Sequence, residues 1–407
     1  MDALMLPLNW QRVRLGDILE LLTDYHANGS YELLKNNVTL LKHVDFAIMI
    51  RTTNFENNDF KNDLIYINKK AYEFLSKSKV FAGDILVNKI ANAGTAYFMP
   101  KLNQPVSLGM NLFLLRIKPN YNNFFIFKQI ANYERVLKTF ANGSATKTIT
   151  KNVIKNLLIP LPPLNEQSAI ANILSALDRY LCTLDALILK KEGVKKALSF
   201  ELLSQRKRLK GFNQAWQRVK VKDFGIIITG STPLTQISEY WNGTISWITP
   251  TDINDNKDIF NSERKITQKG LDTIRMIPKN SVLVTCIASI GKNAILRVNG
   301  ACNQQINAII PNKDFNADFI YYLMENNKQY LLGKAGVTAT YIISKQVFEE
   351  IDFFVPKDLN EQIAIANILS GLDNEIASLK NKKRQFENIK KALNHDLMSA
   401  KIRVLKK

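Results

Sequence analysis

Apolar residues recur at alternating steps of four and three along two separate stretches of the chain. They are Leu177, Leu181, Leu184 and Ile188 in the first stretch and Leu372, Ile376 and Leu379 in the second. This spacing puts the apolar side chains on one face of a helix, as in the seam of a coiled coil. Each stretch continues for about 45 residues. We therefore predict helices of ~65 Å at ~1.5 Å per residue, too long to be covered by one small domain.

Each predicted helix has the same start signal. Prolines precede it and favour an extended approach, and Asn165 or Asn360 follows as the expected N-cap. Glu166 or Glu361 then lies in the positive field of the first turn. Together with the apolar seam, three residues at each start are predicted to pack the helices or to hold partners. These are Asn165, Glu166, Gln167, Asn360, Glu361 and Gln362.

The two helical segments are copies of one another. Residues 165–178 read NEQSAIANILSALD and residues 360–373 read NEQIAIANILSGLD, identical at 12 of 14 positions with an offset of 195. A fainter repeat precedes them, because the Trp-Gln-Arg-Val run at 10–13 returns at 216–219. The chain therefore consists of two copies of one unit. The economical arrangement packs the two helices antiparallel about an internal pseudo-twofold axis.

Outside the helices the pattern changes to short apolar runs interrupted by Gly, Pro, Asn and Asp, as in residues 281–287. Such runs predict strands. The predicted fold is of the α+β class, with two mixed α/β, strand-rich domains separated by two long helices that form an antiparallel coiled coil. We expect strand-rich domains at 1–160 and 211–356, and repeated helical segments at 161–210 and 357–407.

The charge balance adds a partner to this picture. The 407 residues include 55 Lys and Arg against 36 Asp and Glu, a formal net charge of +19. About two-thirds of this surplus lies in residues 179–210 and 374–407, where basic residues outnumber acidic ones by nine to three and by ten to three. Lysine-rich faces also keep long helices soluble. The missing acidic complement nevertheless favours a polyanion, usually nucleic acid, or an acidic partner protein.

Several classes are excluded by what the chain lacks. It has no run of roughly 18 uncharged residues for a membrane span and no secretory signal pattern, so we expect a cytoplasmic protein without a membrane partner. Its three Cys and three His are scattered, which supports neither disulfides nor a metal site. We find no phosphate-binding glycine motif, methyltransferase tetrapeptide, acidic nuclease cluster, metalloprotease motif or nucleophile elbow. The sequence therefore predicts no catalytic residues.

Polar residues concentrate in the turns between predicted strands. Asn and Gln can form paired hydrogen bonds with adenine, Lys and Arg can do so with guanine, and Ser and Thr hold phosphates. Because such turns recur at matched places in both halves, we interpret them as recognition loops. The candidate DNA-binding residues are Tyr25, His26, Asn28, Ser30, Lys89, Asn92, Ser144, Thr146, Lys147, Ser231, Thr232, Thr249, Ser289, Lys292, Asn303, Gln304, Thr338, Thr340 and Tyr341.

The repeated Asn-Glu-Gln segments, with their proline-rich entries and Lys-Lys-Ala-Leu runs, closely resemble the conserved regions of specificity subunits of Type I restriction-modification systems. The resemblance covers nearly the whole chain. The second half adds family-like runs at 230–233, 240–243, 247–249 and 289–292. The first half lacks the matching opening runs, and residues 88–95 replace the last of them.

The resemblance implies a non-catalytic subunit with two target recognition domains. Each would bind one half of a bipartite double-stranded DNA sequence, while the paired helices set the length of the unspecified spacer. It also implies two adenine methyltransferase subunits and two nuclease and translocase subunits as partners. S-adenosylmethionine, ATP and Mg²⁺ are expected in those partners, and no cofactor is expected in this chain. Two alternatives stay open: an atypical DNA-modifying enzyme, and a coiled-coil adaptor whose basic helices bind acidic proteins.

Overall fold

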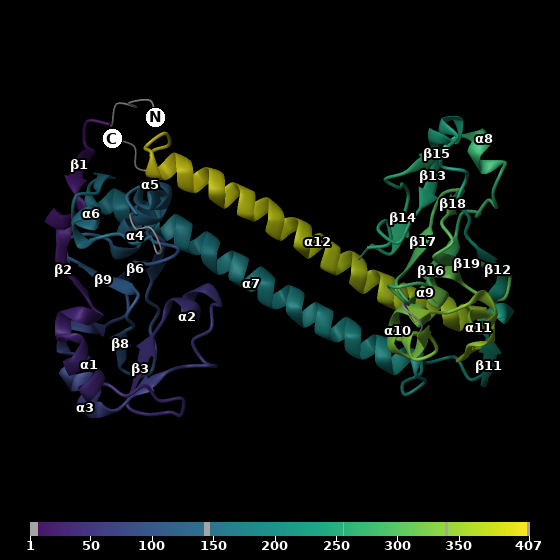
Figure 1. Ribbon diagram of the computed structural model, residues 1–407, viewed down its shortest axis with the longest axis horizontal. Coiled ribbons are helices and arrows are strands. Elements are labelled where there is room, and N and C mark those ends of the chain that lie inside the picture. Colours follow the sequence, from purple (N-terminus) through teal and green to yellow (C-terminus); the bar gives the residue numbers. More distant parts are fainter. Residues whose placement is uncertain (1–6, 142–146, 255, 338–340, 405–407) are drawn as a thin grey trace. The chain divides into compact units, whose positions relative to one another are not determined.

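The computed structural model describes residues 7–141, 147–254, 256–337 and 341–404 (Figure 1). The chain forms two compact units. Unit 1 contains Met1–Thr183 and Lys383–Lys407, and unit 2 contains Leu184–Lys382. This division cuts two helices of 40 residues each, α7 (Leu164–Leu203) and α12 (Leu359–Met398). Each unit therefore holds the first part of one long helix and the last part of the other.

Unit 1 is built on a four-stranded antiparallel sheet in the order β2-β9-β6-β7. Its central strand β6 is buried along its whole length, because its aliphatic side chains pack on both faces of the sheet. Helix α4 follows β9, with Asn122 as its N-cap. The strands are β2 (Leu19–Asp24), β9 (Leu112–Ile117), β6 (Ile85–Asn88) and β7 (Ala96–Phe98), and the helix is α4 (Asn123–Asn132).

A second sheet of unit 1 has the order β4-β3-β8-β5, and the ribbon β1-β10 leads into α7. These strands are β4 (Tyr66–Ile67), β3 (Ala47–Ile50), β8 (Val106–Leu108), β5 (Lys79–Val80), β1 (Gln11–Arg14) and β10 (Leu158–Leu161). The remaining helices are η1 (Leu15–Ile18), η2 (Tyr25–Asn28), α1 (Tyr31–Asn37), α2 (Thr52–Glu56), α3 (Lys69–Phe74), η3 (Ser76–Ser78), α5 (Glu134–Thr139) and α6 (Lys151–Lys155).

Unit 2 repeats the main sheet of unit 1 in the order β12-β19-β16-β17, with β14 added as a fifth strand. Helix α9 follows β19 as α4 follows β9, and Asn316 is its N-cap. The elements are β12 (Gly225–Thr229), β19 (Ile306–Pro311), β16 (Ser281–Thr285), β17 (Asn293–Leu296), β14 (Asp258–Ile259) and α9 (Ala317–Asn326).

A three-stranded sheet of unit 2 has the order β15-β13-β18, and two ribbons, β11-β22 and β20-β21, complete the strands. Their bounds are β15 (Lys265–Ile266), β13 (Trp241–Ile248), β18 (Gly300–Cys302), β11 (Trp216–Lys220), β22 (Asp352–Pro356), β20 (Gly336–Val337) and β21 (Tyr341–Ile342). The other helices are η4 (Val221–Phe224), η5 (Ser238–Tyr240), α8 (Gln268–Leu271), α10 (Lys328–Leu332) and α11 (Lys345–Glu350).

The predicted mixture of strand-rich domains and two long helices is confirmed, but the predicted N-caps are wrong by two residues. Helices α7 and α12 begin at Leu164 and Leu359, so Asn165 and Asn360 lie inside the first turn. The reason is that the preceding residue already starts the helix. The carbonyl oxygen of Pro163 accepts the amides of Glu166 and Gln167, both at 3.0 Å.

Candidate nucleic-acid interface

In unit 2 the predicted recognition loops converge at one edge of the main sheet. The antiparallel order places the ends of β12 and β16 beside the starts of β19 and β17. The loops at residues 230–233, 286–292 and 303–305 therefore lie together, and we call this the loop edge of unit 2. Tyr341 joins the loop edge because its carbonyl oxygen accepts a 3.0 Å hydrogen bond from the Ala288 amide.

Hydrogen bonds tie the loops of this edge to one another. The Ser231 amide donates to the Cys302 carbonyl oxygen at 2.8 Å. The Thr232 hydroxyl donates to Gln304 Oε1 at 2.6 Å. This bond orients the exposed Gln304 side chain and leaves its Nε2 group as a donor for a base edge or a phosphate.

An arginine that the sequence did not single out lies beside this edge. The Arg264 guanidinium lies 4.2 Å from the ring centroid of Trp241 and 4.8 Å from that of Trp247. Trp247 in turn donates from Nε1 to the Ser231 carbonyl oxygen at 2.9 Å. The two tryptophans were visible as part of the family-like runs. Arg264 belongs to a different segment of the chain, and the sequence pattern does not reveal how that segment is aligned with the strand that carries the tryptophans.

Unit 1 has the same loop edge. The ends of β2 and β6 lie beside the starts of β9 and β7, so that loops 25–28, 89–95 and 109–111 come together. Ile90 forms a β-bridge with Thr148, as Ile287 does with Ile342 in unit 2. The exposed Lys147 is therefore held at this edge, in the place that Tyr341 takes in unit 2.

The loops after β6 and β16 share an unusual backbone. Ala91 and Ala288 have φ angles of 64° and 60°, and Gly94 and Gly291 have φ angles of 92° and 80°. A positive φ costs a non-glycine residue roughly 1–2 kcal/mol, so the matched alanines mark loops whose shape the fold imposes. Gly94 and Gly291 therefore serve as turn glycines, in line with the absence of a phosphate-binding glycine motif from the sequence.

Lys89, a predicted DNA contact, is used inside the fold instead. It is buried, and its Nζ lies 3.3 Å from Asp24, which also binds Lys151 at 3.0 Å. Burial by itself raises the pKa of Asp24, but hydrogen bonds and charges from both lysines outweigh burial and lower that pKa. Burial also lowers the pKa of Lys89 despite Asp24. A paired and buried ammonium positions the loop rather than reading DNA.

Four other candidates are engaged in the fold in the same way. Asn28 donates to the Tyr25 carbonyl oxygen and to Ser78 Oγ, and accepts from the Lys77 amide. Tyr25 and Asn303 are buried, and the Thr249 side chain is bonded to Asp252. These residues shape the loops. Candidates with exposed or half-exposed side chains are His26, Ser30, Asn92, Lys147, Ser231, Thr232, Ser289, Lys292, Gln304 and Tyr341. Ser144, Thr146, Thr338 and Thr340 lie outside the described residues.

The repeated Asn-Glu-Gln motif fixes each unit to the long helices. Glu166 is 1% exposed and accepts two hydrogen bonds from Arg403, at 2.7 and 2.9 Å, and one from Trp10 Nε1 at 3.3 Å. Glu361 accepts the equivalent bonds from Arg208, at 3.0 and 2.9 Å, and from Trp216 Nε1 at 3.3 Å. Each carboxylate thus joins the start of one helix to the segment that follows the other.

The glutamine of the motif holds the recognition domain. Gln167 Oε1 accepts from the Asn122 amide at 3.0 Å, and Gln362 Oε1 accepts from the Asn316 amide at 3.0 Å. These asparagines are the N-caps of α4 and α9. Gln167 also donates to the Pro162 carbonyl oxygen at 2.8 Å. The predicted packing role of the motif therefore has a specific form, which is the anchoring of one domain helix in each unit.

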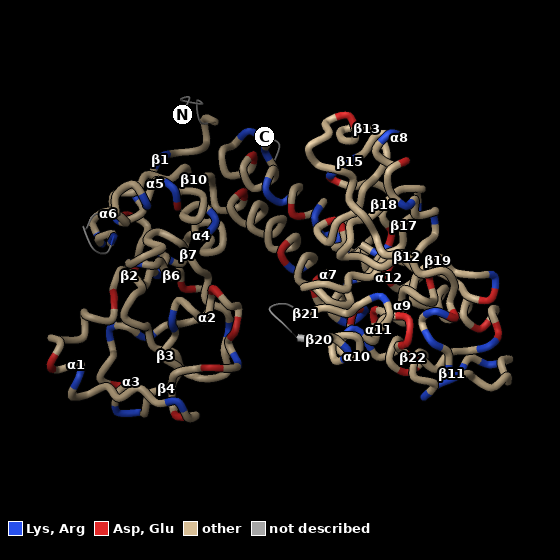
Figure 2. Tube along the Cα trace, turned by 45° about the vertical axis from the view of Figure 1, so that its right-hand side comes forward, with Lys and Arg blue, Asp and Glu red and all other residues tan. Residues whose placement is uncertain are grey.

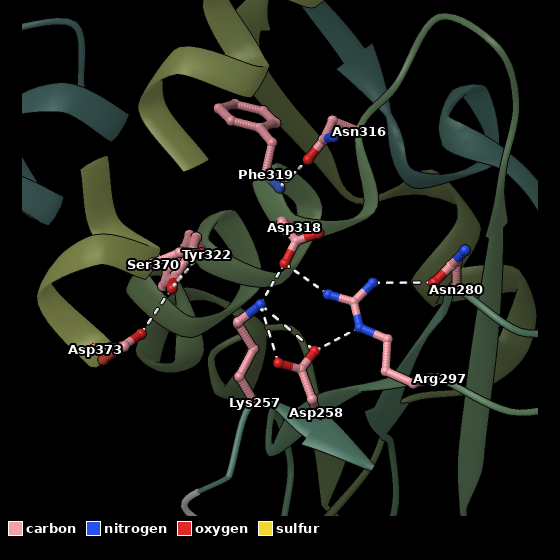
Figure 3. Close-up of polar contacts among 10 residues, drawn as sticks. All are labelled: Lys257, Asp258, Asn280, Arg297, Asn316, Asp318, Phe319, Tyr322, Ser370 and Asp373. Atoms are coloured by element: carbon pink, nitrogen blue, oxygen red, sulfur yellow. Dashed lines mark hydrogen bonds and ion pairs between the residues drawn. The ribbon is translucent and has the colours of Figure 1, made fainter. Parts of the chain in front are cut away.

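A carboxylate further along each helix repeats this link. In unit 2, Asp373 accepts from Tyr322 on α9 at 2.6 Å (Figure 3). It also accepts from Lys195 on α7 at 2.5 Å. In unit 1, Asp178 binds Lys128 on α4 at 3.0 Å and also Lys390 on α12. Burial raises the pKa of Asp178, but the hydrogen bonds and charges of the two lysines outweigh burial and lower it.

A network of alternating charge lies next to Tyr322 in unit 2. Arg297 bridges Asp258 at 2.6 Å and Asp318 at 2.8 Å, and Lys257 contacts both carboxylates (Figure 3). Burial raises the pKa of Asp318, but the two cations outweigh it and lower that pKa. The network joins β14, β17 and α9 into one support for the sheet.

Ion pairs connect the two helix segments inside each unit. In unit 2, Lys191 lies 2.8 Å from Glu375, and Lys380 lies 2.7 Å from Glu192. Residue numbers rise along α7 while they fall along α12, so the two segments are antiparallel there. Both helices carry acidic as well as basic residues (Figure 2). Of the predicted seam, Leu181, Leu184, Ile188 and Ile376 are buried, and Leu177, Leu372 and Leu379 are half-buried.

A metal site finds no support in the described part of the chain, and two of the three cysteines are buried. The described residues contain no group of three or more His, Cys, Asp or Glu that could hold a metal ion. Burial raises the pKa of Cys286 and of Cys302 to about 12, which keeps both thiols protonated and unreactive. None of the helices described is both long and apolar enough to cross a membrane.

These features define a duplicated protein in which two mixed-fold domains present matched polar loop edges and two long helices carry the repeat. A family model for the Type I restriction modification DNA specificity domain matches residues 7–191 and again residues 213–388. The chain therefore belongs to this family. The prediction of a specificity subunit, a targeting component rather than a catalytic one, is confirmed.

Individual relatives agree with this assignment. The Type I restriction enzyme MjaVIII specificity subunit of Methanocaldococcus jannaschii is 25% identical over 439 residues, covering 99% of this chain and 95% of the relative. The MjaIX specificity subunit of the same organism is 36% identical over 182 residues, covering 43% of this chain and 41% of the relative. The crystal structure of a Type I restriction-modification S subunit from M. genitalium has a TM-score of 0.61 at 16% identity, covering 97% of this chain and 98% of that one. The similarity to this crystal structure shows that the fold is shared.

Proposed function

We propose that this chain directs a Type I restriction-modification complex to a bipartite DNA sequence, with each unit binding one half of the target. The observation that carries this proposal is the repetition of the loop edge. Loops 89–95 and 286–292 have the same backbone form and the same β-bridge to a following segment, and each edge is surrounded by exposed polar side chains. Two matched readers on one chain suit a target with two halves.

The proposed readers at each edge are residues whose side chains are available. In unit 2 they are Thr232, Lys292, Gln304 and Tyr341, and in unit 1 they are His26, Asn92 and Lys147. Amide and ammonium groups can distinguish bases in the major groove, and hydroxyls and backbone amides can hold phosphates. The net charge of +19 supplies the sequence-independent part of the affinity.

Helices α7 and α12 are proposed to act as the spacer of the complex by forming an antiparallel coiled coil. The buried seam residues and the ion pairs inside each unit support this role. The anchors at Glu166 and Glu361 would transmit the position of the helices to the recognition domains. Helix length would then determine how many unspecified base pairs separate the two half-sites.

The chemistry is proposed to come from partner chains. Two adenine methyltransferase subunits that bind S-adenosylmethionine, and two nuclease and translocase subunits that use ATP and Mg²⁺, would join the complex in the cytoplasm. The chain itself would contribute binding and geometry. An adaptor for acidic proteins remains the second candidate, because basic residues outnumber acidic ones in the segments 179–210 and 374–407.

Co-expression with a candidate adenine methyltransferase subunit, followed by single-molecule sequencing of the host DNA, tests the proposal. We expect modified adenines in one split motif with a fixed gap. A stable complex that modifies adenines without any sequence preference would contradict the targeting function. Salt-independent binding to acidic proteins, with no binding to DNA, would favour the adaptor.

A further inference from the structure

Unit 1 contains a cavity of about 480 Å³ beside strand β2. Its apolar wall is formed by Leu21, Leu22 and Phe81, and polar side chains come from β2, η3, β5, β9 and α6. Phe81 is 53% exposed, so part of this apolar wall is open to solvent. The loop-edge candidates of the sequence analysis do not include any residue that lines it.

The charge that faces this cavity is of one sign. Four cationic side chains line it, and none of its lining residues is acidic; they are Lys77, Lys79, Arg116 and Lys151. Two of the cations form hydrogen bonds with carboxylates that do not line the cavity. Arg116 forms two hydrogen bonds with Asp84, at 2.9 and 2.7 Å, and Lys151 binds Asp24 at 3.0 Å.

Lys77 differs from the other three cations. Its side chain is exposed, and no carboxylate partner is found for its ammonium among the described residues. Its backbone amide donates to Asn28 Oδ1 at 2.9 Å, so the residue is fixed at its base while the ammonium stays available. The Lys79 ammonium lies 4.7 Å from the centroid of the Tyr72 ring. This neutral partner orients the ammonium without cancelling its charge. Lys77 and Lys79 therefore line the cavity without a carboxylate partner among the described residues, whereas Arg116 and Lys151 are paired.

The position of the cavity relates it to the loop edge. Ala27, one of its lining residues, belongs to the turn that follows β2, and Lys151 follows the segment that bridges Ile90. In unit 2 the residue that corresponds to Arg116 is Ile310, because Ile310 pairs with β12 as Arg116 pairs with β2. The counterpart of Lys151 is Lys345, which is paired with Glu349 at 3.4 Å.

We propose that this cavity is a phosphate-binding subsite of unit 1, which takes one backbone phosphate and its deoxyribose next to the half-site that unit 1 reads. This inference rests on the proposed function. Lys77 and Lys79 contact the phosphate oxygens, while Leu21, Leu22 and Phe81 cover the sugar. The subsite fixes the register of the DNA on unit 1 without reading sequence, and unit 2 holds its half-site without it.

The test uses the full chain in complex with its methyltransferase partner. The DNA is a duplex that carries the motif identified by sequencing of modified adenines. Neutral methylphosphonate linkages are placed one at a time through the half-site of unit 1, and affinity is measured for the wild type, Lys77→Gln and Lys101→Gln. Lys101 is an exposed lysine that follows the opposite end of β7, so it is a matched control for charge.

In the wild type we expect one linkage at which neutralisation weakens binding several-fold. In Lys77→Gln the neutral linkage no longer weakens binding, and the affinity for the duplex without methylphosphonate linkages falls by a similar factor. The slope of log K against log salt concentration becomes shallower by about 1. Lys101→Gln keeps the wild-type profile, and the motif is unchanged in all three proteins. An unchanged methylphosphonate profile and salt slope in Lys77→Gln would overturn the subsite while leaving the proposed function intact. Absence of any preferred motif in the wild type would instead overturn the proposed function.

Discussion

Arg403 donates two hydrogen bonds, of 2.7 and 2.9 Å, to the carboxylate of Glu166, which stands 237 residues earlier in the chain. Arg208 and Glu361 repeat this relationship in the other unit. In both cases the arginine follows the end of one long helix and the glutamate belongs to the first turn of the other. The duplicated sequence therefore does not fold as two successive copies, because each unit takes its closing arginine from the other copy.

The carboxylate of Glu361 is expected to be essential for the stability of unit 2. Glu361→Gln leaves the partly exposed Arg208 without its charged partner and removes one acceptor of Trp216. Because the Glu361 carboxylate is buried, loss of its charge should lower the free energy of unfolding, and the solvent around Arg208 limits the size of the loss. Urea unfolding followed by tryptophan fluorescence measures the change. The exposed Glu263→Gln variant is the control, and equal stability of the two variants would contradict the role of the pair.

Asp178 is expected to make the stability of unit 1 depend on acid. Its folded-state pKa is lowered by Lys390 and Lys128 against the effect of burial. A lowered pKa means that its contribution is fully present above the unfolded value of about 3.9 and is lost as pH falls through the folded value. Asp178→Asn should therefore reduce the free energy of unfolding at pH 7, and this effect should disappear as the pH falls through the lowered pKa of the folded state. An equal loss at pH 7 and below that pKa would show that the carboxylate charge is not the cause.

Much of the fold could be predicted from the sequence because the repeat and the helical seam are local patterns. The anchors at Glu166 and Glu361 could not be assigned, because their arginine partners are distant in sequence and the motif resembles an ordinary helix start. Among the candidate readers, Lys89 is a paired internal lysine because Asp24, at the end of the edge strand β2, lies 3.3 Å from its ammonium. Composition identifies polar loops, but only the strand order determines which side chains remain available.

Gln304 is expected to influence one half-site only. Gln304→Ala removes a donor that Thr232 orients at the loop edge of unit 2, and a base contact of this kind is worth about 1–3 kcal/mol of discrimination. Duplexes with a single changed base pair in the half-site of unit 2 should be methylated more readily by the variant than by the wild type. Gln217→Ala, on the ribbon strand β11, serves as the control. Relaxed recognition in both half-sites would count against separate readers.

The length of the helices is expected to determine the spacer. Insertion of four residues after Ala186 adds about one helical turn, ~6 Å, to α7. Because base pairs rise by about 3.4 Å, the recognised gap should lengthen by one or two base pairs. The half-sites themselves should be unchanged. Footprinting or sequencing of modified adenines gives the gap directly. An unaltered gap in an active complex would exclude the proposal that helix length determines the spacer.

The central claim is that each unit reads its own half of the target, and a domain exchange tests it most directly. Residues 211–356 are replaced by the corresponding domain of a relative with a different target, and the modified adenines of the host are mapped for both chains. The account predicts that one half of the split motif changes while the other half and the gap are kept. A change in both halves, or in neither, would contradict it.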